Sequence, residues 1–261
     1  MGATQTLSAP FDLRLLQAAL NLPRIAVEPL DPRVTRRAEA ARQFYRAVFV
    51  PDRPITPVLV ENGTDLVERA IRESGIRDWI RAVRAFDDAT HQHCLLVAGL
   101  AAAFAARLGL GPAERYRLTR AALLHDVGKI HVPSAILNKP GKLDPGEMAL
   151  VRLHPEQGEA MLAGQGFPPE VLAVVRSHHE MLDGSGYPDG LSGAAIPDLV
   201  RLVTVCDIYG ALIERRPYKP PMAAERACAI LKDMTGRLDP VLVDAFLSVA
   251  TALTPRIPHA A

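Results

Sequence analysis

Two short stretches of the sequence set side chains that can bind metal ions next to one another. The first, ALLHDVGKIHVP at 122–133, places His125 beside Asp126 and follows them with Lys129. An imidazole and a carboxylate suit a divalent cation, because the carboxylate has two oxygen atoms and can bridge two ions. Alternatively, this is a helix C-terminus where His125 and Lys129 complement the helix dipole. For this pair alone, the alternative is favoured.

The second stretch, SHHEMLDGSGYPDG at 177–190, places His178 and His179 where a helix gives way to a glycine-rich loop. Adjacent residues on a helix point about 100° apart, so the two rings face different directions. Each ring could therefore face a different ion, or one ring could bind metal while the other faces a ligand.

The loop that follows must turn back sharply beside these histidines. Gly184 and Gly186 permit the positive φ angles that such a turn requires, and Pro188 stiffens it. Glu180 and Asp183 have two open roles, because each could bond to the histidines or cap the loop.

Six side chains that can bind metal lie within or at the ends of apolar helical segments, where an unpaired imidazole is costly to bury. One shared metal cluster satisfies all of them, whereas separate partners would require several unrelated hydrogen-bond networks. A structural zinc is disfavoured because no cysteine cluster is present. Two ions bridged by Asp126 fit better. The six are His93, His125, His154, His178, His179 and Asp207.

The remaining histidines, His91, His131 and His259, are expected to be ordinary surface or loop residues. The three cysteines are an odd number, widely spaced in apolar runs, which indicates reduced, buried thiols. They are Cys94, Cys206 and Cys228.

Most of the chain has the helical period of about 3.6 residues, and no segment alternates as a strand does. The sequence therefore predicts an all-α fold. Two helices are expected within 10–49, a Pro-rich connection at 51–63, and long helices from Thr64 toward Phe86 and from Asp88 to Leu108. Further helices are expected to start at Pro112, Asp144–Pro145, Pro168–Pro169 and Asp239–Pro240.

The composition limits the classes of partner. The chain has 261 residues and 49% apolar composition, enough for a substantial core. Its net charge is +1, so no global field favours DNA, RNA or an anionic membrane. The first residues lack a signal peptide's pattern, and no apolar run reaches the length of about 20 residues that spans a bilayer. We expect a cytoplasmic protein without membrane insertion.

The motifs together resemble one known family. HD at 125–126 with Gly128 and Lys129, followed by HHExxDGxGYP at 178–188, resembles the HD-GYP subgroup of HD-domain metal-dependent phosphohydrolases. The resemblance covers about residues 88 to 250. It implies a helical HD-domain bundle and a phosphodiesterase for bis-(3'-5')-cyclic di-GMP, acting through a hydroxide that bridges two ions. The family's metal ligands fall on His93, His125, Asp126, His154, His178, His179 and Asp207.

The resemblance also implies that Asp126 takes part in the reaction as well as binding metal. It further implies roles for four residues that do not bind metal. Lys129 resembles the catalytic lysine near the scissile phosphate. Tyr187 resembles the tyrosine of GYP, whose ring could stack a guanine or pack on its own domain. Arg216 and Lys219 in RRPYK resemble residues that hold the other phosphate or base, although they could be a solvated helix terminus before Pro217.

One departure from the family bears on the metal count and the product. Some members carry a Glu one helical turn before the first histidine that helps hold a third metal, and here this position is Ala89. The resemblance thus implies two ions, iron or manganese, and favours stopping at pGpG over full conversion to GMP. Asp88 is the neighbouring carboxylate that could substitute.

Three functions remain open beside one another. The leading one is the cyclic di-GMP phosphodiesterase, the second a phosphohydrolase for another cyclic dinucleotide or nucleotide. The third is a non-catalytic module that binds the dinucleotide or a diguanylate cyclase. We expect an N-terminal helical module at 1–75, regulatory, dimerising or lid-forming, and the HD-GYP domain at 76–261. A homodimer is one expected assembly.

Overall fold

The computed structural model describes residues 29–48, 50, 53–86, 88–214 and 221–253. Within these ranges the regular elements are all helical, and pairing of the β type is confined to two isolated bridges. The predicted all-α class is therefore confirmed. In chain order the described helices begin with α2 (Pro32–Val48), α3 (Pro57–Val83), α4 (Ala89–Arg107) and α5 (Pro112–Leu124). The others are η1 (Val127–His131), α6 (Ser134–Leu137), α7 (Pro145–Val151), α8 (His154–Leu162), α9 (Pro169–Ser177), η2 (Gly193–Ala195), α10 (Asp198–Ile213), α11 (Ala224–Asp233) and α12 (Pro240–Thr251).

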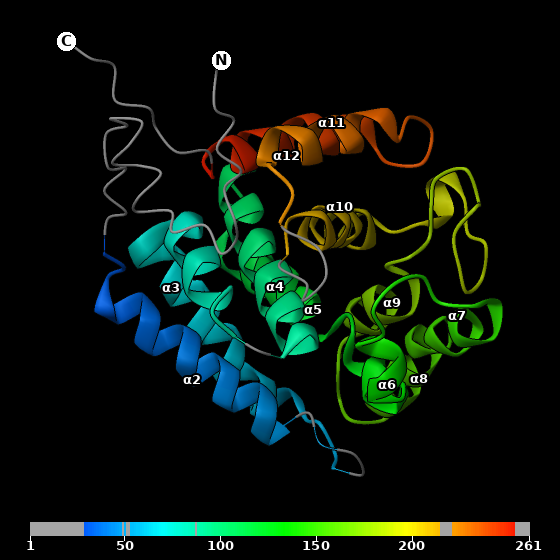
Figure 1. Ribbon diagram of the computed structural model, residues 1–261, viewed down its shortest axis with the longest axis horizontal. Coiled ribbons are helices and arrows are strands. Elements are labelled where there is room, and N and C mark those ends of the chain that lie inside the picture. The colour runs from blue at the N-terminus through cyan, green and yellow to red at the C-terminus, as the bar shows by residue number, and fades with distance from the viewer. Residues whose placement is uncertain (1–28, 49, 51–52, 87, 215–220, 254–261) are drawn as a thin grey trace, which may run out of the picture.

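Helix α4 runs through the middle of the bundle, with α3, α5, α10 and α12 packed around it (Figure 1). Among the described helices, α4 alone is long and apolar enough to cross a membrane, but 72% of that apolar window is buried inside the protein. A helix that is apolar on all sides is also what the core of a folded domain requires. This helix carries His93 into the interior.

The helix starts predicted at Pro112, Asp144–Pro145, Pro168–Pro169 and Asp239–Pro240 are confirmed, whereas the helix predicted from Thr64 begins seven residues earlier, at Pro57. Pro occupies the first turn of α5, α7, α9 and α12, where its missing N–H removes no helical hydrogen bond. Asp144 and Glu147 form a capping box at the start of α7. Asp239 caps α12 by accepting hydrogen bonds from the main chain.

The expected connection at 51–63 is wrong for its second half, because α3 already begins at Pro57. Pro57 is tolerated there as the first helical residue. Gly63 lies inside the helix, where a Cβ atom would come within 2.3 Å of the Phe44 ring. The glycine thus serves close packing of α2 on α3 rather than a turn.

The N-terminal helices share the core of the rest of the chain. Val34, Ala38 and Tyr45 of α2 are buried, and the Tyr45 hydroxyl donates a hydrogen bond to the main-chain carbonyl of Leu123 on α5. The proposed boundary after residue 75 coincides with a kink in α3, where Gly75 has the non-helical angles φ 76° and ψ 168°. The division into two domains stays a prediction, and residues 10–28 of the expected first helix lie outside the described part.

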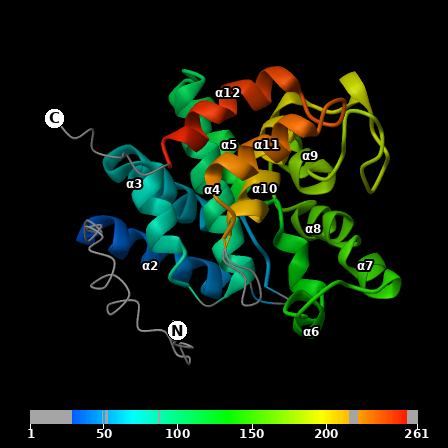
Figure 2. The ribbon, with the colours of Figure 1, turned by 45° about the horizontal axis from the view of Figure 1, so that its top comes forward.

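Helices α6, α7 and α8 form a separate group to one side of the central helices (Figure 2). Helix α8 joins this group to the rest of the bundle by packing on both η1 and α9. Gly128 of η1 makes the contact, because its position leaves no room for a side chain beside the main chain of His154 and Gly158. The tight crossing brings the end of α5 next to the start of α8.

The cysteines carry no disulfide. Cys94 and Cys206 are buried as expected, whereas Cys228 on α11 is only half-buried. Among the histidines expected at the surface, His131 is exposed and His259 lies outside the described residues. His91 was also expected at the surface, but it is half-buried in the first turn of α4, with its ring 5.2 Å from the Tyr45 ring.

Replacing Gly128 by Ala should destabilise the protein. The new Cβ would lie 1.9 Å from the His154 carbonyl oxygen and 2.6 Å from the Gly158 nitrogen, which are main-chain atoms that cannot rotate away. We expect a loss of about 3 kcal/mol, which lowers the Tm by about 6 to 12 °C. Thermal unfolding of the chelator-treated protein, followed by circular dichroism, measures this.

The matched control is Gly146→Ala in α7, where the nearest atom to the new Cβ is Asp144 Oδ1 at 3.4 Å. Its Tm should change by no more than about 2 °C. Equal melting of the two variants would contradict the role assigned to Gly128.

Candidate metal centre

The structure brings together all seven side chains that the sequence suggested as metal ligands. They come from α4, the ends of α5 and α9, the start of α8, and α10. Their ligand atoms form two groups, and within each group all atoms lie within 4.8 Å of one another. The first group is Asp126, His154, His178 and His179, and the second is His93, His125 and Asp207.

Asp126 lies between the two groups. Its Oδ1 atom is 3.1 Å from Nε2 of His154 and 3.6 Å from Nε2 of His178. Its Oδ2 atom is 3.4 Å from Nε2 of His125 and 3.6 Å from Nε2 of His93. One oxygen faces each group, which is the arrangement of a carboxylate that bridges two ions.

Three of the histidines have a defined tautomer. The Nδ1 atoms of His125, His154 and His178 lie 2.7, 2.6 and 3.0 Å from main-chain carbonyl oxygens three residues earlier. A carbonyl oxygen only accepts hydrogen bonds, so Nδ1 must carry the proton in each ring. The Nε2 atom of each neutral ring therefore presents a lone pair to the cluster.

These lone pairs face other ring nitrogens. Nε2 of His154 lies 3.3 Å from Nε2 of His178, and Nε2 of His125 lies 3.4 Å from Nε2 of His93. At His154 and His178 this brings two acceptor nitrogens together, and they repel one another in a buried site unless a cation lies between them, whereas Nε2 of His93 can donate, since it also lies 2.9 Å from Asp207 Oδ1. The buried Oδ1 of Asp126 likewise has no hydrogen-bond donor among the described residues. The donor set fits divalent transition metals.

Burial and charge set the protonation of the cluster. Burial lowers the pKa of His178 to about 4. For Asp126, burial raises the pKa, but Lys129 and His125 outweigh it and hold the pKa well below its usual value. Asp207 is also buried, and its hydrogen bond with His93 lowers its pKa. A neutral imidazole and ionised carboxylates are the forms that bind metal.

Glu214, at the C-terminal end of α10, lies beside the metal-ligand cluster, although the sequence did not suggest it as a site residue. Its Oε2 atom lies 2.8 Å from Nδ1 of His93, and Asp207 Oδ1 lies 2.9 Å from Nε2 of the same ring. Burial of His93 opposes its protonation, yet the two carboxylates raise its pKa to about 10. The sequence did contain a signal for Glu214, because it follows Asp207 by seven residues and residues seven apart share a helix face.

A cavity of 460 Å³ opens beside the cluster. The metal-binding elements supply His93, Lys129, His179, Asp207 and Glu214 to its wall. Residues of α6 and the following loop, from Ile136 to Leu143, line another part. Its size falls in the range of about 300 to 1,000 Å³ that small-molecule sites occupy.

Of the three basic residues suggested to bind the substrate, the described part of the chain includes Lys129. Nζ of Lys129 lies 2.5 Å from Oδ2 of Asp126 and lines the cavity. Arg216 and Lys219 lie outside the described residues. Their suggested contacts therefore stay predictions.

Tyr187 lies next to the cluster, but it does not line the cavity. Its ring stacks on the His179 ring at 4.6 Å between centroids and 26° between planes. The Arg152 guanidinium lies over the Tyr187 ring, 5.0 Å from its centroid. The tyrosine packs on its own domain, which was the alternative to stacking a guanine, and a substrate contact stays a prediction.

The loop around Tyr187 is held by Glu180. This buried carboxylate accepts hydrogen bonds from the main-chain nitrogens of residues 189, 190 and 191, so it caps the loop. Asp183 similarly accepts from the nitrogen of residue 185. Gly184 has the expected positive φ of 78°, but Gly186 does not. A Cβ at Gly186 would lie 2.5 Å from the His179 carbonyl oxygen, so close approach explains this glycine.

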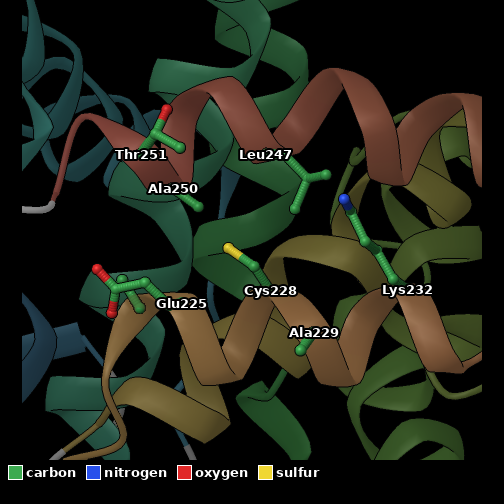
Figure 3. Close-up of a pocket in the computed structure, with 8 residues that line it drawn as sticks. Glu225, Cys228, Ala229, Lys232, Leu247, Ala250 and Thr251 are labelled. Atoms are coloured by element: carbon green, nitrogen blue, oxygen red, sulfur yellow. The ribbon is translucent and has the colours of Figure 1, made fainter.

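A second hollow, of 270 Å³, lies between α11 and α12 (Figure 3). Small and apolar side chains such as Ala229, Leu247 and Ala250 line most of it, with Glu225 and Lys232 at its edges. It shares no lining residue with the cavity beside the cluster. Without a convergent set of polar groups, it is not the candidate site.

Comparisons with known proteins agree with this geometry. A family model described as "HD domain" matches residues 67–242. Together with the arrangement of His125, Asp126 and the HHExxDGxGYP segment, this shows that the chain belongs to the HD-domain family, in its HD-GYP subgroup.

Two curated relatives and one solved structure illustrate the similarity. The chain is 36% identical over 250 residues to the "Cyclic di-GMP phosphodiesterase response regulator RpfG" of Xanthomonas campestris pv. campestris, covering 90% of this chain and 64% of that protein. It is 39% identical over 160 residues to "3'3'-cGAMP-specific phosphodiesterase 3" of Vibrio cholerae, covering 59% and 35%. The chain thus spans less than two thirds of either relative.

The solved structure is that of Bd1817, an HDG"Y"P protein from Bdellovibrio bacteriovorus. It has a TM-score of 0.68 at 21% identity and covers 91% of this chain and 78% of that one. At this identity the similarity supports the fold, including helices outside the family-model match.

The packing of Tyr187 on His179 predicts that its ring matters more than its hydroxyl. Tyr187→Phe keeps the ring and should bind Mn(II) as the wild type does. Tyr187→Ala removes the support of the His179 ring, and we expect Mn(II) affinity to fall about 10-fold, as for other groups that orient metal ligands. Calorimetric titration of chelator-treated protein measures both variants. A loss in the Phe variant equal to that in the Ala variant would contradict this.

Proposed function

We propose that the protein is a metal-dependent phosphodiesterase that hydrolyses bis-(3'-5')-cyclic di-GMP. The observation that carries the proposal is the pair of ligand groups joined by Asp126 at the wall of a cavity of 460 Å³. The curated relatives support it, since their names assign them phosphodiesterase activity on cyclic di-GMP or 3'3'-cGAMP. The substrate is inferred for this chain from that similarity.

The site has the parts that phosphodiester hydrolysis needs. Two divalent ions, when bound, would lower the pKa of a water nucleophile and neutralise charge on the phosphate. Asp126 would hold both, with His154, His178 and His179 on one side and His93, His125 and Asp207 on the other.

The chain's own groups would stabilise and orient the phosphate. Lys129 holds a positive charge at the cavity wall, because Asp126 and Asp207 raise its pKa against the effect of burial. A fixed ammonium group beside the scissile phosphate stabilises the charge that develops there. Arg216 and Lys219 are proposed to hold the second phosphate or base, as the family resemblance implies.

Two ions are proposed rather than three. Ala89, which by the family resemblance stands where some members carry a metal-binding Glu, lines the cavity without a ligand atom. Asp88 accepts a hydrogen bond of 2.8 Å from the main-chain nitrogen of His91 and so caps α4. It is in neither ligand group. We therefore propose pGpG as the main product.

The ions are proposed to be iron or manganese, since imidazole and carboxylate ligands suit both. A cytoplasmic location, a homodimer, contact with a diguanylate cyclase and a regulatory role for the N-terminal helices stay predictions. A related activity on 3'3'-cGAMP is the second candidate, favoured by the Vibrio cholerae relative.

A product time course tests the activity. The purified 261-residue chain is given cyclic di-GMP or 3'3'-cGAMP anaerobically, with Fe(II) or Mn(II), and products are separated by chromatography. We expect linear pGpG to appear fastest from cyclic di-GMP. A His125→Ala, Asp126→Ala variant should lose at least about 1,000-fold in rate, because both ligand groups lose a member.

The matched control is His131→Ala, which removes an exposed histidine of η1 and should keep wild-type rates. Absence of product with either metal and either substrate would exclude the enzyme and favour a binding module. Faster hydrolysis of 3'3'-cGAMP would establish the second candidate instead.

The identity of residue 89 predicts the final product. Ala89→Glu adds a carboxylate at the cavity wall in the first turn of α4, where an acidic group is also favourable to the helix dipole. We expect metal analysis to rise from two ions per chain toward three, and GMP to accumulate after pGpG. Two ions and pGpG alone in this variant would show that residue 89 does not determine the product. Asp88→Asn, which can still cap the helix, should leave the wild-type count unchanged.

A further inference from the structure

We propose that Glu214 is a positioning residue for the metal centre, holding the His93 ring with Nδ1 protonated and thereby strengthening the binding of the ion at His93, His125 and Asp207. The inference rests on the metal site of the proposed function and adds a residue outside the expected ligand set. A carboxylate that accepts a hydrogen bond from the far nitrogen of a metal-binding histidine fixes its tautomer and raises its basicity.

The two nitrogens of the His93 ring have different surroundings. Nε2 faces the ligand atoms of the cluster, at 2.9 Å from Oδ1 of Asp207, 3.4 Å from Nε2 of His125 and 3.6 Å from Oδ2 of Asp126. Nδ1 faces away from these atoms and lies 2.8 Å from Oε2 of Glu214. A metal ion bound at Nε2 therefore requires the proton on Nδ1, where Glu214 is the acceptor.

Glu214 is held in place by the main chain around it. Its nitrogen donates to the carbonyl oxygen of Gly210 at 2.9 Å, the last helical hydrogen bond of α10. Nη2 of Arg84, at the end of α3, donates to the carbonyl oxygen of Ile213 at 2.9 Å. The Glu214 side chain is only 5% exposed. The main chain and the burial of the side chain therefore hold the carboxylate beside His93.

His93 differs in this respect from three other histidines of the cluster. The Nδ1 atoms of His125, His154 and His178 donate to uncharged main-chain carbonyls. A hydrogen bond to a carboxylate is stronger and adds a negative charge near the ion. Removing this charge should therefore weaken one of the two ion sites and leave the site at His154, His178 and His179 less affected.

The test measures metal binding and needs no turnover. The chelator-treated 261-residue chain is titrated with Mn(II), and free Mn(II) is followed by electron paramagnetic resonance. Glu214→Gln keeps an oxygen acceptor without the charge, and we expect one of two Mn(II) ions to bind about 10-fold more weakly. Glu214→Ala removes both and should weaken the same site about 100-fold. Glu225→Gln, an exposed acidic residue on α11, is the control and should bind both ions as the wild type does.

The outcomes separate this inference from the proposed function. Weaker binding at one site, with an unchanged Tm of the metal-free variants, supports the positioning role. Wild-type Mn(II) affinity in both Glu214 variants overturns it while leaving the metal centre intact. Loss of binding only through unfolding of the metal-free variants makes Glu214 structural and also overturns it. If the wild type takes up no Mn(II), the metal centre and this inference fail together.

Discussion

The burial of Asp126 among ring nitrogens is the constraint on which the rest of the structure depends. Nε2 atoms of histidines from α4, α5, α8 and α9 point toward its two oxygens. A carboxylate and several lone pairs cannot share so small a buried volume unless positive charge balances them. The helices therefore have to meet at fixed angles, and the contact at Gly128 is one means by which they do.

The same need explains why the histidines sit where helices end. At the end of a helix, a ring can donate Nδ1–H to a carbonyl of its own last turn, and His125 and His178 do so. These carbonyls have no partner within the helix, so one hydrogen bond satisfies the carbonyl and orients the ring. Helix ends thus fix ring orientation without further side chains, whereas His93, in the body of α4, depends on Glu214.

Much of this was predictable from the sequence. Apolar helical periodicity with buried histidines predicted both the helical class and the convergence of His93, His154 and Asp207, because unpaired buried imidazoles need a partner. Pro with an acidic residue marked the helix starts. Pro57 was misjudged because proline suits both a connection and a first helical turn.

Other features depend on distances that a sequence does not contain. Glu214 could be matched to the face of Asp207 but not to the Nδ1 side of the His93 ring. Gly186 was expected to supply a positive φ angle, and the Tyr187 ring either to stack a guanine or to pack on its own domain. Close approach of the loop to the His179 main chain explains the glycine instead, and the tyrosine ring packs on the His179 ring. Tertiary contact, rather than local preference, sets these roles.

The hydrogen bond from Tyr45 to the Leu123 carbonyl has a mechanical consequence. Leu123 is two residues from His125, so helix α2 is hydrogen-bonded to the same turn that presents His125 and Asp126. A rotation or sliding of α2 would act through the Tyr45 side chain on the main chain of Leu123, two residues before His125. A signal arriving at α2 would need to travel only the length of one side chain to alter the spacing of the ligand atoms.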